Sequence, residues 1–237
     1  MKCNTSRLAV LAVGLISFGA AAQHVLAVPA VFFDRDDSTG FMTSFPNSLA
    51  KFNQFTGSLA SYGVDNIDSA VGVNPTLTFG ATGITAATQG VLAQSAPGFQ
   101  IGTQALLEFD AAVPTSAVDT VFTFNQYITA FGLYVIQGGD GANNNPTAFR
   151  LKDTVANTFV DVPVQIGPGW EIDNAFFLGV ADAVPFNQVQ ILESTDLNDG
   201  MLYDNVVAGR VPEPGSLVLM VLGGVCVLCR TTRFRRG

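Results

Sequence analysis

Ile128-Thr-Ala-Phe-Gly-Leu-Tyr-Val-Ile136 is the stretch of sequence that decides the fold. In an extended chain, successive side chains point to opposite faces, so Phe131, Leu133 and Val135 lie on one face. The other face carries Ala130, Gly132, Tyr134 and Ile136. β-Branched and aromatic residues are enriched in strands, and the Gly- and Asn-rich run that follows, up to Pro146, is typical of a surface loop. The stretch therefore predicts a β-strand that ends at this loop.

Shorter segments of the same kind recur along the chain, separated by turn signals. The predicted strands cover residues 76–79, 105–109, 118–124, 148–152, 159–166, 175–180, 188–193 and 201–207. One short helix is predicted over residues 46–62, because Phe45, Leu49, Phe52 and Phe55 recur at helical spacing. Many short strands at regular intervals are typical of an antiparallel sandwich. We therefore expect an all-β fold, a jelly-roll-like antiparallel β-sandwich, in a single domain over residues 28–210.

The first 27 residues have the features of a secretory signal peptide. Lys2 and Arg7 precede an uncharged segment rich in Ala, Leu and Val, residues 8–22, as the charged and apolar regions of such peptides do. Small residues offer two cleavage points, after Ala27 and after Ala22, and we favour Ala27. The segment predicts export through the cytoplasmic membrane.

The last 27 residues hold three signals in order. Pro212, Glu213 and Pro214 come first, and neither a helix nor an interior strand tolerates these prolines, which lack a backbone N–H. An apolar run over residues 217–229 then predicts a transmembrane helix, although it is shorter than the about 20 residues that a bilayer usually needs. Arginines close the chain, at Arg230, Arg233, Arg235 and Arg236. By the positive-inside rule they stay in the cytoplasm and leave the preceding chain outside.

The order, spacing and terminal position of these signals resemble the PEP-CTERM sorting signal, with Pro212, Glu213 and Pro214 as its motif. The resemblance implies that exosortase, a transpeptidase-like membrane protease, reads the tail in a bacterium rich in exopolysaccharide. The same kind of tail is also labelled the ice-binding protein C-terminal domain. Residues 128–133, 176–191 and 202–206 further resemble secreted β-sandwich domains that often precede this tail, with the architecture of carbohydrate-binding modules.

Removing both ends changes the composition of what remains. Residues 28–211 contain no cysteine, and the one histidine, His24, lies in the predicted signal peptide. Disulfides, Ser-His-Asp triads and histidine-ligated zinc are therefore excluded from the exported domain. Residues 28–211 contain five basic and 18 acidic residues, which gives a net charge of −13. A domain with this charge repels nucleic acid, so nucleic acid is not an expected partner.

Acidic residues near both ends of the domain suggest a structural calcium as one interpretation. Ca²⁺ takes about six to eight oxygen ligands, and Asp34 or Asp36 could supply them together with Asp204 from the last strand. The alternative is that these residues lie in ordinary Asp-rich turns, with Asp204 hydrogen-bonded to a neighbouring loop. No other cofactor is expected.

Two further interpretations concern sugars. Trp170 lies in a Gly- and Pro-rich turn, where it could stack on a sugar ring or cover the core, and the same alternatives apply to Tyr62, Tyr127 and Tyr134. Glycoside hydrolysis needs two carboxylates that flank a cleft. The candidate acids are Glu108, Glu171 and Glu193, but nothing in the sequence pairs them.

These observations favour a non-enzymatic, exported protein of the cell surface or extracellular matrix. Its predicted partners are the membrane, through the C-terminal helix before processing, and an exosortase-like protease. The alternative function is a carbohydrate-binding module for exopolysaccharide, and a glycoside hydrolase is a third hypothesis. No catalytic residue is assigned.

Overall fold

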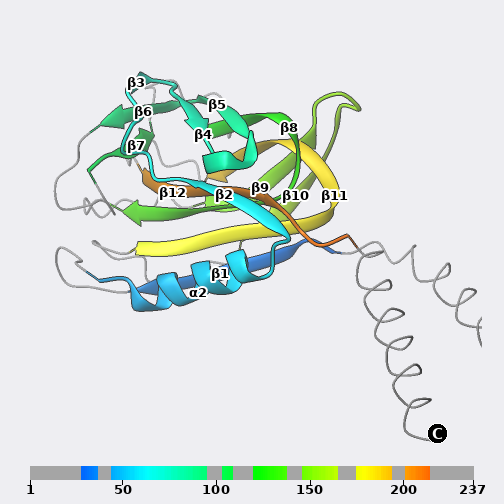
Figure 1. Cartoon of the computed structure of the whole chain (residues 1–237), viewed down its shortest axis with the longest axis horizontal. Coiled ribbons are helices and arrows are strands. Elements are labelled where there is room, and N and C mark those ends of the chain that lie inside the picture. Colours follow the sequence, from blue (N-terminus) through cyan, green and yellow to red (C-terminus); the bar gives the residue numbers. More distant parts are fainter. Residues whose placement is uncertain are drawn as a thin grey trace, which may run out of the picture. The chain divides into compact units, whose positions relative to one another are not determined.

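Two long strands, β8 (Thr120–Gln137) and β11 (Ala175–Glu193), run through both layers of the structure (Figure 1). The computed structural model describes residues 28–36, 44–94, 103–108, 120–137, 146–164, 175–193 and 201–213. Within it, Val28–Val211 form one unit. The two long strands pair antiparallel, from Ala175 opposite Ile136 to Ile191 opposite Thr120. The other strands of both layers therefore assemble on this central pair.

The first layer is built on the second half of β8 and the first half of β11. β1 (Ala30–Asp36) pairs with β11, and β12 (Met201–Arg210) pairs with β8. β12 also pairs with β2 and β7, and β7 continues to β6 and β3. The bounds of these outer strands are Ser61–Asp65 for β2, Gly72–Val73 for β3, Val91–Gln94 for β6 and Ala105–Glu108 for β7.

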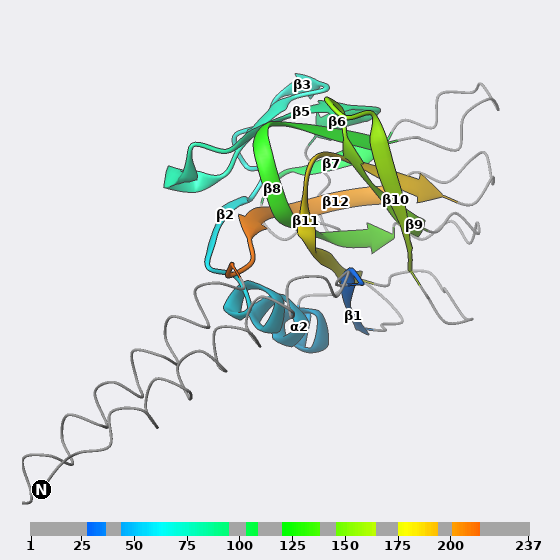
Figure 2. The ribbon, with the colours of Figure 1, turned by 90° about the vertical axis from the view of Figure 1, so that its right-hand side faces the viewer.

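The second layer is built on the other halves of the same two strands. β9 (Pro146–Asp153) pairs with β11, and β10 (Thr158–Pro163) pairs with β9 (Figure 2). On the other side, β5 (Thr85–Gln89) pairs with β8, and β4 (Thr76–Thr78) pairs with β5. A short 3₁₀ helix, η2 (Gly80–Thr82), joins β4 to β5. Every strand pair among the described residues is antiparallel.

The change of layer coincides with irregular pairing in β11. Its register against β8 shifts between Ala181 and Phe186, and again before Gln188. The carboxylate of Asp182 accepts a 3.0 Å hydrogen bond from the Val184 N–H, and Pro185 has no N–H to donate to a neighbouring strand. Bulges of this kind bend a strand and increase its twist. The bend lets one continuous strand serve both layers.

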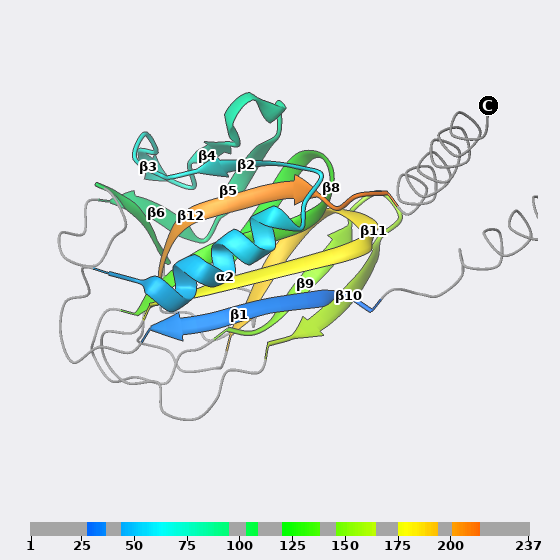
Figure 3. The ribbon, with the colours of Figure 1, turned by 60° about the horizontal axis from the view of Figure 1, so that its bottom comes forward.

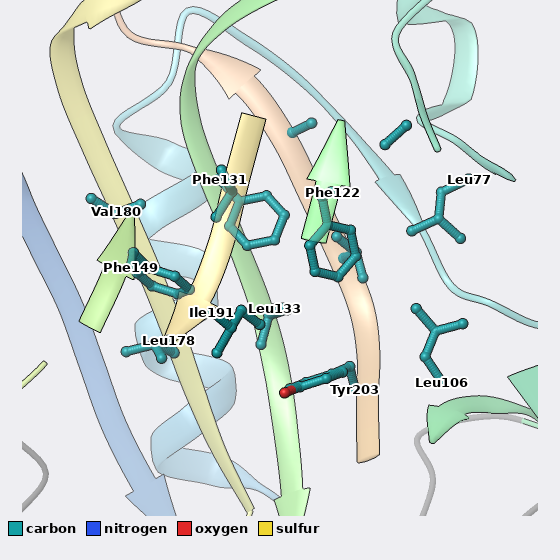
Figure 4. Packing of buried hydrophobic residues seen from close by; sticks show 14 of the residues in the cluster. Leu77, Leu106, Phe122, Phe131, Leu133, Phe149, Leu178, Val180, Ile191 and Tyr203 are labelled. Atoms are coloured by element: carbon teal, nitrogen blue, oxygen red, sulfur yellow. The ribbon is translucent and has the colours of Figure 1, made fainter. Parts of the chain in front are cut away.

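The space between the layers is filled by apolar side chains. Phe131, Leu133 and Val135 point into it from β8, as their shared face predicted, and meet Phe122 from the other half of the same strand. The Phe122 and Phe131 rings lie 5.0 Å apart, and Phe149 meets Phe131 edge-on (Figure 4). Aromatic pairs in this geometry are favourable beyond their buried area. This cluster is the main core.

The opposite face of the first layer is covered by a helix, α2 (Pro46–Gly57) (Figure 3). Phe55 is fully buried there against Phe177, Tyr134 and Ala130. Gly132 and Gly179 lie beneath these rings, where a Cβ at either position would approach Phe55 and Phe177 within about 3 Å. The first layer is therefore buried on both faces, which is why residues 128–136 are apolar on both sides.

The expected all-β antiparallel sandwich is confirmed, with corrections to its elements. The segments predicted at 118–124 and 128–136 form one strand, as do those at 175–180 and 188–193, because bulges rather than turns separate them. The helix ends at Gly57 rather than at residue 62, and Leu49 is 51% exposed. Strands β1, β2, β3, β5 and β6 were not predicted. The signal peptide and the apolar tail segment lie outside the described residues.

Candidate functional site

A polar surface covers the outer side of the second layer. Phe149 and Leu151 of β9 are buried in the core, so alternation along the strand turns Arg150 and Lys152 outward. Pairing places the same outward row on neighbouring strands. We call this surface the polar face; its members are Thr123, Arg150, Lys152, Phe159, Asp161, Gln188 and Gln190.

Hydrogen bonds between side chains link three members of the polar face. The Gln190 Nε2 donates to Gln188 Oε1 at 2.9 Å, and the Gln188 Nε2 donates to Thr123 Oγ1 at 3.0 Å. An amide group both donates and accepts. Within the described residues, Gln190 Oε1 and the Thr123 hydroxyl proton have no partner. This series of three hydrogen-bonded side chains therefore offers a free acceptor at Gln190 and a free donor at Thr123.

An ion pair and an aromatic ring lie at the edge of the same face. Arg150 donates to both carboxylate oxygens of Asp161, at 2.7 and 2.8 Å. The Arg150 guanidinium also lies 4.4 Å from the centroid of the Phe159 ring, which is 59% exposed. These contacts hold Arg150 in place, and they leave Phe159 accessible to solvent.

The charge state of this pair persists in mild acid. The hydrogen bonds from Arg150 lower the pKa of Asp161 below its ordinary value, against a smaller opposing effect of burial. The same bonds raise the pKa of Arg150. Because the carboxyl pKa is lowered on folding, the pair stabilises the fold above about pH 4 and loses that contribution as the pH falls through the lowered pKa. Asp161 therefore stays ionised and paired with Arg150 from roughly pH 5 to pH 8.

The predicted calcium ligands have other roles in the structure. The carboxylate of Asp36 accepts hydrogen bonds from the Asn47 and Ser48 N–H groups, at 2.9 and 2.8 Å. Asp34 accepts from its neighbour's backbone and lies 4.0 Å from the Lys51 ammonium. The described residues contain no group of three or more Asp, Glu, His or Cys side chains that could hold a metal ion. The calcium hypothesis has no support from this part of the chain.

Asp36 acts instead as the cap of α2. The residue at the N-cap position, Phe45, has no side-chain acceptor for the first N–H groups of the helix. The carboxylate of Asp36, which lies 11 residues before Asn47 in the sequence, supplies this acceptor, and Asp36 is only 4% exposed. A carboxylate at a helix N-terminus also interacts favourably with the helix dipole. Asp36 therefore fixes the helix to the end of β1.

Asp204 is fully buried in β12, where the strand bulges. Its carboxylate accepts a 2.6 Å bond from the Asn205 N–H, and Asn205 has a positive φ of 44°. Burial raises the pKa of the nearby Tyr134 hydroxyl, and the charges of Asp36 and Asp204 raise it further. Tyr134 is 3% exposed, so it does not serve as a stacking platform for sugar.

The acids of the hydrolase hypothesis do not form a visible pair. Glu108 is 3% exposed and accepts hydrogen bonds from the hydroxyls of Thr120, at 3.1 Å, and Tyr203, at 3.5 Å. A carboxylate enclosed in this way does not face a cleft. Glu171 and Trp170 lie outside the described residues, as does the side chain of Glu193. Tyr62 and Tyr127 are 45% and 39% exposed but are not members of the polar face.

The sandwich is held together up to the start of the predicted sorting motif. The Val211 N–H donates to Thr129 Oγ1 at 2.7 Å, and the Ala60 N–H donates to the Arg210 carbonyl at 2.8 Å. Pro212 and Glu213 follow with exposed side chains and no regular secondary structure. Pro214, the four arginines, Ala22 and Ala27 lie outside the described residues. Among the described helices, none has the length and apolar character needed to cross a membrane.

The polar face was not predicted from the sequence. The signal was the alternation Gln188-Val-Gln190-Ile, together with Arg150-Leu-Lys152. Each pattern puts polar side chains on one side of a strand. Which strands are neighbours became visible only from the pairing of β9, β11 and β8.

No protein-family model matches the sequence, and no curated protein matches it. Among solved structures, the chain is similar to a carbohydrate-binding module of family 29, with a TM-score of 0.37 and 15% identity over 63% of this chain and 90% of the other. It is also similar to a xylan-binding domain of family 22 from Paenibacillus barcinonensis, with a TM-score of 0.37 and 12% identity over 63% of this chain and 94% of the other. A likeness this remote carries no inference about the ligand of this chain.

Proposed function

We propose that residues 28–211 form a non-catalytic domain that binds polysaccharide on the polar face. The observation that carries this proposal is the series of hydrogen-bonded side chains from Gln190 through Gln188 to Thr123, on the same face as the exposed ring of Phe159, which lies on the far side of β9. These groups are already oriented by their own hydrogen bonds. Binding a ligand to them costs less conformational entropy than ordering mobile side chains would.

The chemistry of the face suits a sugar better than an apolar ligand. A pyranose ring presents adjacent hydroxyls, each a donor and an acceptor, around a flatter C–H surface. A side-chain amide can donate a hydrogen bond to one sugar hydroxyl and accept a hydrogen bond from another. An aromatic ring can stack on the C–H surface, and this contact removes apolar area of the ring from water. The paired row Phe159–Lys152–Gln188–Thr123 spans three strand spacings, or about 14 Å. It is long enough to contact more than one sugar ring.

The polysaccharide proposal is tested by affinity electrophoresis of residues 28–211 in native gels that contain one polysaccharide each. We expect retardation by at least one polymer, and Phe159→Ala to weaken it roughly three- to tenfold, the effect of losing one aromatic contact. Tyr62→Ala is the matched control, because Tyr62 is also exposed but lies on the other layer. Equal weakening by both variants would show that Phe159 has no special role.

We further propose that the protein is exported and held at the membrane by its C-terminal segment until a protease of the exosortase type cuts near Pro212-Glu213-Pro214. The support is the order of the signals in the sequence, together with a chain that stays hydrogen-bonded to the sandwich as far as Val211, whose N–H donates to Thr129 Oγ1 of β8. A protease would then meet accessible chain directly after the folded domain. The processed product would be a protein of the cell surface or extracellular matrix.

Intact mass of the protein recovered from its producing cells tests this second proposal. The expected mass lacks residues 1–27 and everything beyond the Pro-Glu-Pro motif, because both segments serve only delivery. Any additional mass would point to an attached glycan or lipid. A mass that retains the apolar run and the arginines would overturn the processing proposal and leave a simple membrane anchor.

A further inference from the structure

We infer that the polysaccharide bound by the polar face carries acidic groups, and that Lys152 is the residue that binds them. This inference rests on the proposed function, since it names the chemical class of the ligand at the same site. Its starting point is the distribution of charge. The domain has a net charge of −13, yet two of its five basic residues, Arg150 and Lys152, point outward from the same side of β9.

Lys152 differs from the other basic residues in having no partner within the described part of the chain. Arg150 is held by Asp161, Lys51 lies near Asp34, and Arg210 donates to Gln126 Oε1 at 3.0 Å. Arg35 also takes part in an interaction. The ammonium of Lys152 is therefore the cation whose hydrogen-bond donors are open to a ligand.

The strand register puts Lys152 in the middle of the proposed site. Phe159 of β10 lies opposite it on one side, and Gln188 of β11 lies opposite it on the other. Residues directly opposite across a strand pair have Cβ atoms about 4.5–5.5 Å apart. A sugar ring that stacks on Phe159 and bonds to Gln188 therefore has to pass over the ammonium of Lys152, within reach of a carboxylate on that ring.

The acidity of the rest of the domain does not prevent this contact. Charges beyond a Debye length of about 8 Å are largely screened at physiological ionic strength. Within the polar face, Arg150 and Lys152 outnumber Asp161, so its formal charge is positive. The excess of acidic residues elsewhere disfavours other contacts with a polyanion. An acidic chain is thereby directed to this face.

The test uses two forms of one polymer: polygalacturonate, and the same polymer with its carboxyl groups reduced to alcohols. Residues 28–211 are run in native gels that contain one form or the other. These residues form one unit, and they leave out the arginine tail, which would itself bind a polyanion. We expect the acidic form to retard the domain more strongly, and Lys152→Gln to weaken that retardation about three- to tenfold, the range for one exposed charge-assisted contact. Lys152→Arg should retain it. Raising the salt concentration should weaken binding of the acidic form alone.

Lys51→Gln is the matched control, because it makes the same change in net charge on α2, beside the first layer. Equal retardation by the two polymer forms would overturn the inference and leave the polysaccharide proposal standing. Stronger retardation by the acidic form that Lys152→Gln and Lys51→Gln reduce equally would overturn the assignment to Lys152. Retardation by neither form would count against both the inference and the proposed function.

Discussion

Replacing Gly63 with alanine is expected to destabilise the domain by about 3 kcal/mol, at the upper end of the usual cost of overpacking. Gly63 lies in β2, and a Cβ built on it would overlap the carbonyl oxygen of Phe79 and lie 2.8 Å from the Phe79 Cβ. Phe79 is fully buried in the main core, so neither group can move aside cheaply. For a domain of this size the loss corresponds to a fall in melting temperature of roughly 6–12 °C.

Gly57→Ala is the control for this prediction. Gly57 is the last residue of α2, and nothing lies within 4 Å of a Cβ built on it. Because alanine is the better helix former, this variant should be neutral or more stable by up to about 1 kcal/mol. Thermal unfolding followed by circular dichroism compares the two. If the Gly63→Ala domain had the same melting temperature as the wild type, β2 could not approach Phe79 as closely as the structure shows.

Removing the cap of α2 should have the second large effect. Asp36→Ala deletes the acceptor of two helix N–H groups, one of them buried, and leaves both without a charged partner. Hydrogen bonds to charged groups contribute about 1.5–3 kcal/mol each, and a lost cap costs about 0.5–2 kcal/mol. We expect a loss of about 2–3 kcal/mol in the free energy of unfolding, measured by urea denaturation, because water can partly replace Asp36 at the part-buried N–H of Asn47.

Asp34→Ala separates this role from a general effect of charge on the same strand. Asp34 has a half-exposed side chain and one long ion pair with Lys51, at 4.0 Å. Exposed pairs of this kind contribute about 0–1 kcal/mol. Asp36→Asn keeps one acceptor oxygen and should fall between the two alanine variants. Equal losses for Asp34→Ala and Asp36→Ala would show that the helix does not depend on this cap.

The strands could be predicted where side-chain alternation is local. Residues 128–136 have the predicted two faces, with Leu133 in the main core and Tyr134 beneath α2. The sequence did not show that β8 and β11 are continuous, because residues around Asn125 and Pro185 have the composition of turns. In the structure these residues lie in strands that bend at register shifts. A bulge and a turn look alike when the neighbouring strand is unknown.

The candidate site could not be predicted for a related reason. Gln188 meets Thr123 across 65 positions of sequence, and Asp36 reaches the helix start from a different element. Local patterns indicate which way a side chain points, but not what lies opposite it. The one prominent aromatic signal, Trp170, lies outside the described residues, while the exposed Phe159 stood in an ordinary strand pattern.

Polysaccharide binding by the polar face of the second layer can be tested directly by changing the face itself. The most direct measurement compares residues 28–211 with a variant in which Phe159, Gln188 and Gln190 are all alanine, in gels that contain a polysaccharide that retards the wild type. All three side chains are at least partly exposed, so the variant should keep its fold, which its melting curve verifies. The folded variant is expected to migrate as it does without polysaccharide. A folded variant that is retarded as strongly as the wild type would show that the polar face is not the binding site.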